Sequence, residues 1–246
     1  MRDIEDILHF RQDISPFLVH LTRSGDGKTA ASVLRAIVTE KQLRPGDTEV
    51  SVARYGGITT GMSQEHRRTF FNAICFTETP LSEVHCLLDI KYRQVDLEPF
   101  GLVFLKDNLR RKGVAPVLYL NNEGDDQDVV VRAMFTLTET SPEAARLLLP
   151  LMSVFGRKLQ PLGAAEHQEG VLDWLWEREW RYPYVRGALA FDVADVFVGL
   201  CPDNKIVEFE SLWPEIAFID PTRSMKWYAT KLIKARQRLN LKYSVV

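Results

Sequence analysis

The apolar residues of this chain occur in short runs that end at prolines, glycines or charged residues. Short runs that alternate between apolar and polar residues favour β-strands, whereas apolar residues spaced three and four apart favour helices. Both kinds occur in irregular order, with no regular β-α-β unit and no internal repeat. We therefore expect an α+β fold of mixed small β-sheets with flanking helices. The length of 246 residues suits a single domain spanning 1–246.

Individual elements follow from the same patterns. Strands are predicted at 17–22, 73–77, 100–104, 116–120, 129–137, 174–184 and 196–200. Helices are predicted at 29–41, 82–88, 106–112 and 142–155. The acidic segment 123–128 is expected to be a turn, and the glycines between residues 50 and 70 favour a loop.

The charge is distributed unevenly along the chain. The total is only -2, so no overall field draws the protein to nucleic acid or membrane. After Asp220, however, there are seven Lys and Arg residues and no acid, which leaves -9 for the rest. Apolar residues in this tail have helical spacing, and we expect a basic helix at about 222–242, docked by its apolar side. Its basic side is either a solvated face or a surface for nucleic acid or an acidic partner.

The cellular compartment is expected to be the cytoplasm. The three cysteines cannot all pair and form no CxxC motif, which is typical of reduced thiols. The first residues are acidic where a signal peptide needs positive charge. No apolar stretch approaches the ~20 residues that cross a bilayer, so no membrane partner is expected.

Several familiar sites do not match the sequence. Gly27-Lys28-Thr29 matches the end of a phosphate-binding loop motif. The motif also requires a glycine at position 22, where this chain has Thr22. Neither the cysteines nor the histidines show the paired spacing of a structural zinc site. No metal site is predicted.

Two segments remain as candidates for chemistry. His20 and Thr22 lie at the end of a predicted strand, although a histidine on a half-buried strand is commonly structural. Between residues 174 and 184, aromatic residues alternate with charges. As a strand, this segment would pack its aromatic face into the core and place Glu177, Glu179 and Arg181 together on the other face. The three charges form either a functional carboxylate pair or a surface ion-pair cluster.

The order of these segments resembles a known family. His20-x-Thr22, Cys75-Phe76-Thr77-Glu78-Thr79-Pro80-Leu81 and Glu177-x-Glu179-Trp180-Arg181 resemble motifs of the AbiGi-type abortive-phage-resistance proteins, over residues 15–185. The chain also looks like a diverged ADP-ribosyltransferase of the DarT toxin group. Those enzymes share an N-terminal His-x-Thr strand, a following helix and a late catalytic Glu on a strand.

The resemblance implies an ADP-ribosyltransferase-like fold and a transferase with NAD as its substrate. Glu179 would hold the ribose and stabilise its positive charge, and Glu177 would orient or deprotonate the acceptor. His20 would bind a ribose of NAD, beside Thr22. Phe76 and Thr77 would line the nicotinamide pocket. An arginine is also expected in the site, and the candidates are Arg54, Arg67, Arg68 and Arg178, with Arg54 assigned to NAD binding. A catalytic tyrosine could be Tyr55 or Tyr119.

Three functions are therefore carried forward. The first is a toxin or anti-phage ADP-ribosyltransferase, whose acceptor is a nucleic acid or a protein and whose partner could be an antitoxin. The second is a non-catalytic antitoxin or phage-sensing protein on the same fold. The third is a metal-dependent nuclease using Glu177 and Glu179.

Overall fold

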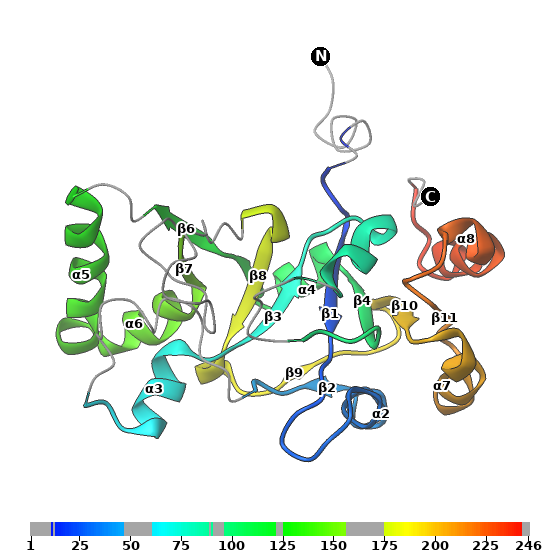
Figure 1. Ribbon diagram of the computed structural model, residues 1–246, viewed down its shortest axis with the longest axis horizontal. Helices are drawn as coiled ribbons and strands as arrows, with labels where there is room; N and C mark the ends of the chain where they lie inside the picture. Colours follow the sequence, from blue (N-terminus) through cyan, green and yellow to red (C-terminus); the bar gives the residue numbers. More distant parts are fainter. Residues whose placement is uncertain are drawn as a thin grey trace.

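The computed structural model describes residues 11, 13–46, 61–88, 90, 96–121, 125–155 and 175–242. A seven-stranded sheet runs through the middle of this part of the chain (Figure 1). Helices α3, α5 and α6 lie toward one end of the sheet, and α7 and α8 lie at the other.

The large sheet has the strand order β11-β10-β4-β1-β3-β8-β5. Its strands are β1 (Phe17–Leu21), β3 (Ala73–Thr77), β4 (Gly101–Leu105), β5 (Ala115–Pro116), β8 (Glu179–Pro183), β10 (Val196–Leu200) and β11 (Phe218–Ile219). Neighbouring strands pair antiparallel, except β10 and β11. Two small sheets join β2 (Gln42–Leu43) to β9 (Leu189–Ala190), and β6 (Leu118–Asn121) to β7 (Met152–Phe155). A mixture of helices with mainly antiparallel strands agrees with the α+β prediction.

The α-helices are α2 (Ala30–Glu40), α3 (Gln64–Phe71), α4 (Lys106–Arg111), α5 (Asp125–Thr140), α6 (Pro142–Leu148), α7 (Ile206–Leu212) and α8 (Ala229–Arg238). Short 3₁₀ turns are η2 (Leu81–Leu87), η3 (Leu149–Leu151), η4 (Leu175–Glu177), η5 (Tyr184–Arg186), η6 (Asp203–Lys205) and η7 (Met225–Tyr228). No helix in the described ranges is both long and apolar enough to span a membrane.

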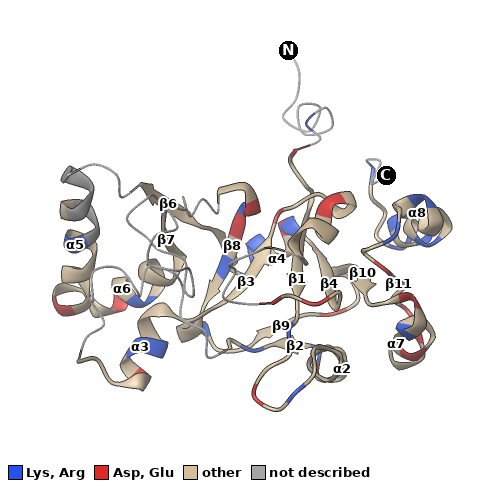
Figure 2. Cartoon of the chain, in the orientation of Figure 1, with Lys and Arg blue, Asp and Glu red and all other residues tan. Residues whose placement is uncertain are grey.

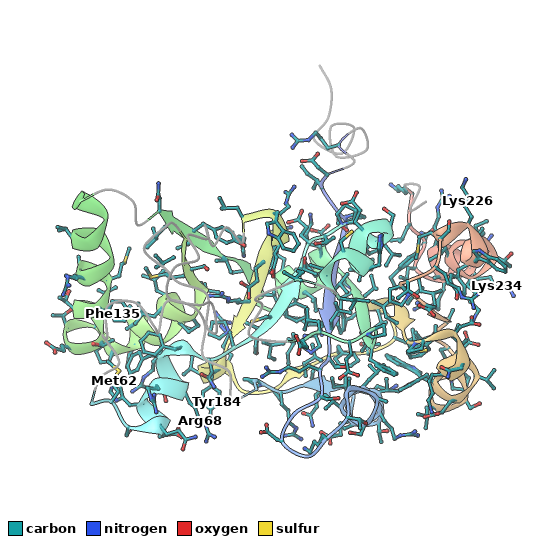
Figure 3. All side chains as sticks on the ribbon, viewed as in Figure 1. Met62, Arg68, Phe135, Tyr184, Lys226 and Lys234 are labelled. Atoms are coloured by element: carbon teal, nitrogen blue, oxygen red, sulfur yellow. The ribbon has the colours of Figure 1, made fainter. Side chains whose placement is uncertain are left out.

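Two hydrophobic clusters pack against the sheet. The larger surrounds β1, β4 and β10 and includes Phe104 and Phe197. The smaller contains Phe71 from α3 and Phe135 from α5, together with Met152 and Val154 of β7. Met62 and Phe135, labelled in Figure 3, lie at the α3–α5 end of the molecule. Strand β3 contributes to both clusters, because Ala73 belongs to the smaller and Ile74 to the larger.

Helix α2 shows how local sequence signals define an element. The Thr29 side chain caps its first turn by accepting a hydrogen bond from the Ser32 amide. Leu34, Ile37 and Val38 form its buried side, as their spacing predicts. Lys41 ends the helix in the left-handed conformation, with φ of 53°.

The prediction of a strand at 129–137 is wrong, because this segment belongs to helix α5. Its β-branched residues favour a strand locally. In the fold, Phe135 packs against Phe71 with ring centroids 5.8 Å apart, while Thr136 and Thr138 bond carbonyls of the preceding turn. Packing of Phe135 into the smaller cluster thus outweighs the local preference.

The helix predicted at 142–155 is too long. Helix α6 ends at Leu148, a 3₁₀ turn follows, and residues from Met152 form strand β7. Pro150 lacks the amide hydrogen that a continuing helix needs. Ser141 precedes the helix at the N-cap position, but its side chain makes no capping hydrogen bond.

Two other segments differ from their predictions. The predicted loop at 50–70 contains helix α3, capped by Ser63, whose side chain accepts from the His66 amide; residues 50–60 lie outside the described residues. The strand predicted at 116–120 is divided between β5 of the large sheet and β6 of a small one.

Candidate active site

The three sequence motifs lie on neighbouring strands. Strand β1 carries His20, β3 carries Phe76 and Thr77, and β8 begins at Glu179. These strands are adjacent in the order β1-β3-β8, although more than 150 residues of sequence separate the first from the last. Val19 pairs with Thr77, and Thr77 pairs with Glu179 across the next ladder.

Strands β1 and β3 pair only briefly. Their ladder consists of the single pair Val19–Thr77, whereas β1 and β4 pair through five positions. Figure 1 shows β3 diverging from β1 beyond this pair. In a continuing antiparallel ladder Leu21 would be the next hydrogen-bonded residue opposite Cys75. Among the described residues, Leu21 has no such strand partner. We call the position lined by His20, Leu21 and Cys75 the β1–β3 opening.

The side chain of His20 turns into this opening. Its Nδ1 lies 2.8 Å from the carbonyl oxygen of Cys75. In a continuing ladder, this oxygen would accept a hydrogen bond from Leu21 instead. Because a carbonyl only accepts, Nδ1 carries the proton and donates. Burial lowers the pKa of His20 despite the opposing effect of this hydrogen bond. In the neutral ring, Nε2 is then an acceptor.

Glu179 forms a bidentate ion pair with Arg181 on the same face of β8. Arg181 Nε donates to Oε1 at 2.9 Å, and its second nitrogen donates to Oε2 at 2.7 Å. The Arg181 side chain is 4% exposed and that of Glu179 is 16% exposed. Burial alone would lower the pKa of Arg181, but the charge and hydrogen bonds of Glu179 reverse the effect and raise it.

Arg181 also connects this ion pair to a neighbouring segment of the same chain. It donates to the carbonyl oxygens of Pro150 and Met152, at 3.0 and 2.7 Å. The turn η3 and the start of β7 therefore fix the guanidinium, and the guanidinium fixes Glu179.

Cys75 and Tyr119 lie beside the Glu179 carboxylate. Cys75 is opposite Arg181 in the β3–β8 ladder, and its side chain is exposed. Desolvation by the surrounding protein raises the pKa of Cys75, and the negative charge of Glu179 raises it further. The Tyr119 hydroxyl accepts from the Glu179 amide at 2.8 Å, and burial raises the pKa of Tyr119 to about 12.

The other predicted NAD-binding residues have internal roles. The Thr22 hydroxyl donates to the carbonyls of Ala30 and Phe100. Phe76 is buried and packs edge-on against Phe104. The Thr77 hydroxyl donates to the carbonyl of Glu177 at 2.6 Å. These contacts hold the three strands and their connections, and the Phe76 ring also lies 5.6 Å from the ring of His20.

The expectation of one continuous charged strand face is wrong. Glu177 lies in η4, and Arg178 adopts a left-handed φ of 46° before β8 begins. This break separates Glu177 from the alternation that places Glu179 and Arg181 together. Trp176 is 46% exposed rather than packed in the core, whereas Tyr182 is buried as predicted. Residue 174 lies outside the described part.

Glu78 was not singled out from the sequence, yet it organises the start of β8. It is buried and accepts from Lys106 Nζ at 2.9 Å and from Trp180 Nε1 at 2.8 Å. Arg178 lies 3.5 Å away and also bonds the Asp13 carbonyl. The signal in the sequence that could have identified Glu78 is its place between two threonines, in the segment Phe-Thr-Glu-Thr-Pro at 76–80.

The structure also separates the arginine and tyrosine candidates. Arg54 and Tyr55 lie outside the described residues, while Arg67 and Arg68 are on α3. Of the residues described, Arg181 is the arginine bonded to Glu179, a pairing the sequence suggested only as charge neutralisation. Tyr119 is the tyrosine beside it.

In the described ranges, no three His, Cys, Asp or Glu side chains come together as metal ligands. Comparison with protein-family models, with curated proteins and with solved structures finds no match to this chain.

Proposed function

We propose that this protein is an ADP-ribosyltransferase that uses NAD as its substrate and acts in toxin–antitoxin or anti-phage defence. The observation that carries the proposal is the β1–β3 opening, which lies between the His20 strand and β3, the strand that pairs with the Glu179 strand on its other edge. The toxin and defence role rests on the sequence resemblance described above.

The opening suits the carboxamide of nicotinamide. By strand alternation, the backbone N–H and C=O of Leu21 point toward β3, because Thr22 bonds Phe100 on the β4 side. A carboxamide has both an acceptor and donors, so it can bond the N–H and C=O of Leu21 in place of Cys75. His20 Nε2 can accept from a ribose hydroxyl, since Nδ1 is committed to Cys75.

The chemistry requires negative charge beside the sugar. When the bond between ribose C1′ and nicotinamide breaks, nicotinamide leaves and positive charge develops on the ribose. An acceptor nucleophile then forms a new bond to C1′ and loses its proton. A carboxylate fixed near C1′ stabilises that charge. Glu179 forms an ion pair with Arg181, and each carboxylate oxygen retains a further lone pair for a ribose hydroxyl.

The test measures the transfer of labelled ADP-ribose from NAD to lysate protein or to total nucleic acid. It compares the amount transferred by wild type with that transferred by Glu179→Gln. We expect transfer by wild type and a loss on the order of 100-fold or more in the variant. Glutamine keeps an acceptor for Arg181 but removes the charge. Nuclease and protease treatment of the labelled product would identify the acceptor class.

A structural effect must be separated from a chemical one, because losing a buried ionic partner costs ~3–5 kcal/mol. Asp195→Asn is the matched control, since Asp195 is also a buried carboxylate paired with a cation, Lys112. It should retain transfer at any temperature at which both variants are folded by circular dichroism. Equal loss in both variants, or transfer retained by Glu179→Gln, would contradict the proposed role.

One observation favours a non-catalytic binding protein instead. Both oxygens of Glu179 are bonded to Arg181, and the Thr22 and Thr77 hydroxyls are used within the protein. A purely structural ion pair would look the same. Absence of transfer by wild type, together with no thermal shift on adding NAD, would support this second function.

A further inference from the structure

The surface of η7 and α8 carries a second feature, at the end of the molecule opposite α5. Side chains that face solvent here are Lys226, Trp227, Thr230, Ile233, Lys234 and Gln237. We call them the Trp227 surface. Figure 2 shows the concentration of Lys and Arg over α8, and Figure 3 shows Lys226 and Lys234 on its outer side. We propose that this surface binds single-stranded nucleic acid.

The helix is held firmly from behind. Tyr228, Leu232 and Ala235 are buried in the larger cluster, as the spacing of the basic tail predicts. Arg238 donates to the carbonyls of Val196 and Phe197 on β10. The exposed side of α8 is therefore presented on a rigid support, so little ordering is needed when a ligand binds.

Most of the basic residues of this tail are already engaged. Arg223 pairs with Asp203, and Lys231 pairs with Glu210. Arg236 and Arg238 donate to backbone carbonyls. Lys226, Lys234 and Lys242 differ, since no carboxylate in the described part of the chain pairs with them, and the first two of these lie on the Trp227 surface. These two ammonium groups are the charges available to phosphates.

Trp227 provides the second component. It is 74% exposed, the largest aromatic surface among the exposed hydrophobic side chains of the described residues. The guanidinium of Arg223 lies 5.5 Å from its ring centroid. An exposed indole plane flanked by cations is what nucleic-acid-binding surfaces use to stack bases while neutralising the backbone.

The combination of an exposed indole with two lysines favours a single-stranded nucleic acid over other acidic partners. In a duplex the base faces are stacked and unavailable to Trp227, whereas in a single strand each base offers a π-face. An acidic protein would satisfy the lysines but gives no reason for an indole that is 74% exposed beside them. This binding is independent of ADP-ribosyl transfer, because the residues that carry it are not those of the β1–β3 opening.

The test is fluorescence anisotropy of the full chain with labelled mixed-sequence 20-nucleotide DNA and RNA strands and a matched duplex. We expect single strands to bind, with log K falling with log salt at a slope of about -1.4 for roughly two phosphates. Trp227→Ala should weaken binding at least about fivefold. The double variant Lys226→Glu with Lys234→Glu should weaken it about tenfold or more.

A charge-matched control is Arg110→Glu with Arg111→Glu, which reverses two exposed residues of α4. It should leave affinity within about twofold at 150 mM salt, where surface charges are screened beyond ~8 Å. All the substituted side chains are exposed, so melting temperatures should stay close to wild type.

Three outcomes would overturn the proposal. The first is no binding of single strands at low salt. The second is equal weakening by the α8 and α4 double variants. The third is competition by polyglutamate combined with full affinity of Trp227→Ala, which would identify the surface as one for acidic proteins.

Discussion

At the residue scale, His20 occupies the position where backbone pairing between β1 and β3 ends. Its imidazole gives the Cys75 carbonyl a hydrogen bond that Leu21 would supply in a continuous sheet. His20 thus satisfies the Cys75 carbonyl at the position where β1 and β3 do not pair. Because Nδ1 carries the proton, Nε2 is the ring nitrogen that remains for a ligand.

The lowered pKa of His20 leads to a prediction about pH. The unfolded chain binds a proton at the ordinary pKa of about 6.5, while the folded chain resists it. The free energy of unfolding should therefore fall as pH drops below ~6.5, by at most ~1.4 kcal/mol per pH unit from this group. Urea denaturation of wild type and His20→Gln between pH 5 and 8 measures the difference. Parallel pH profiles for the two proteins would show that His20 does not cause the loss.

At the element scale, the close approach of β1 and β4 depends on Gly101. A Cβ at this position would lie 2.2 Å from the carbonyl oxygen of His20 and 3.1 Å from Leu21 Cα. Both contacts are with backbone, which cannot rotate away. The missing side chain therefore lets β4 support the part of β1 that β3 does not pair with.

Gly101→Ala should consequently destabilise the protein by ~1–3 kcal/mol, as overpacking does. Gly25→Ala is a suitable control, because its Cβ would meet nothing within 4 Å. Chemical denaturation of both variants measures the effect. Similar stabilities for the two would mean that β1 and β4 move apart without cost.

At the scale of the whole molecule, one sheet connects two hydrophobic clusters. Strand β3 has side chains in both, and Arg181 of β8 bonds carbonyls beside the smaller cluster. Loss of either cluster would thus remove support from the same strands. The β1–β3 opening and the Glu179–Arg181 pair lie where these two parts of the core meet.

We therefore expect the chain to unfold as one cooperative unit. Phe71→Ala in the smaller cluster and Phe209→Ala in the larger should each cost ~3–5 kcal/mol, since both side chains are fully buried. Circular dichroism and tryptophan fluorescence should give coincident denaturation curves in each variant. A residual transition at the wild-type midpoint in Phe71→Ala would instead indicate two independent units.

Several parts of the fold could be predicted because their signals are local. Strands β1, β3 and β10 are short runs rich in apolar β-branched and aromatic residues, and Thr29 marks the beginning of α2. The buried stripe of α8 was predicted by spacing alone. The segment that became α5 was not, since its strand-like composition gives way to the packing of Phe135 against Phe71.

The candidate site shows the same division. The sequence by itself determined that His20 lies near the end of a strand, because a polar segment follows Thr22. It also determined that Glu179 and Arg181 share a face, because side chains in a strand alternate with a period of two residues. Only the tertiary structure decided that β1, β3 and β8 are neighbours, that β1 and β3 part after Val19 and Thr77, and that Arg181 bonds the Pro150 and Met152 carbonyls. Strand order, register and the partners of a buried charge depend on residues distant along the chain, and their energies appear only when those residues meet.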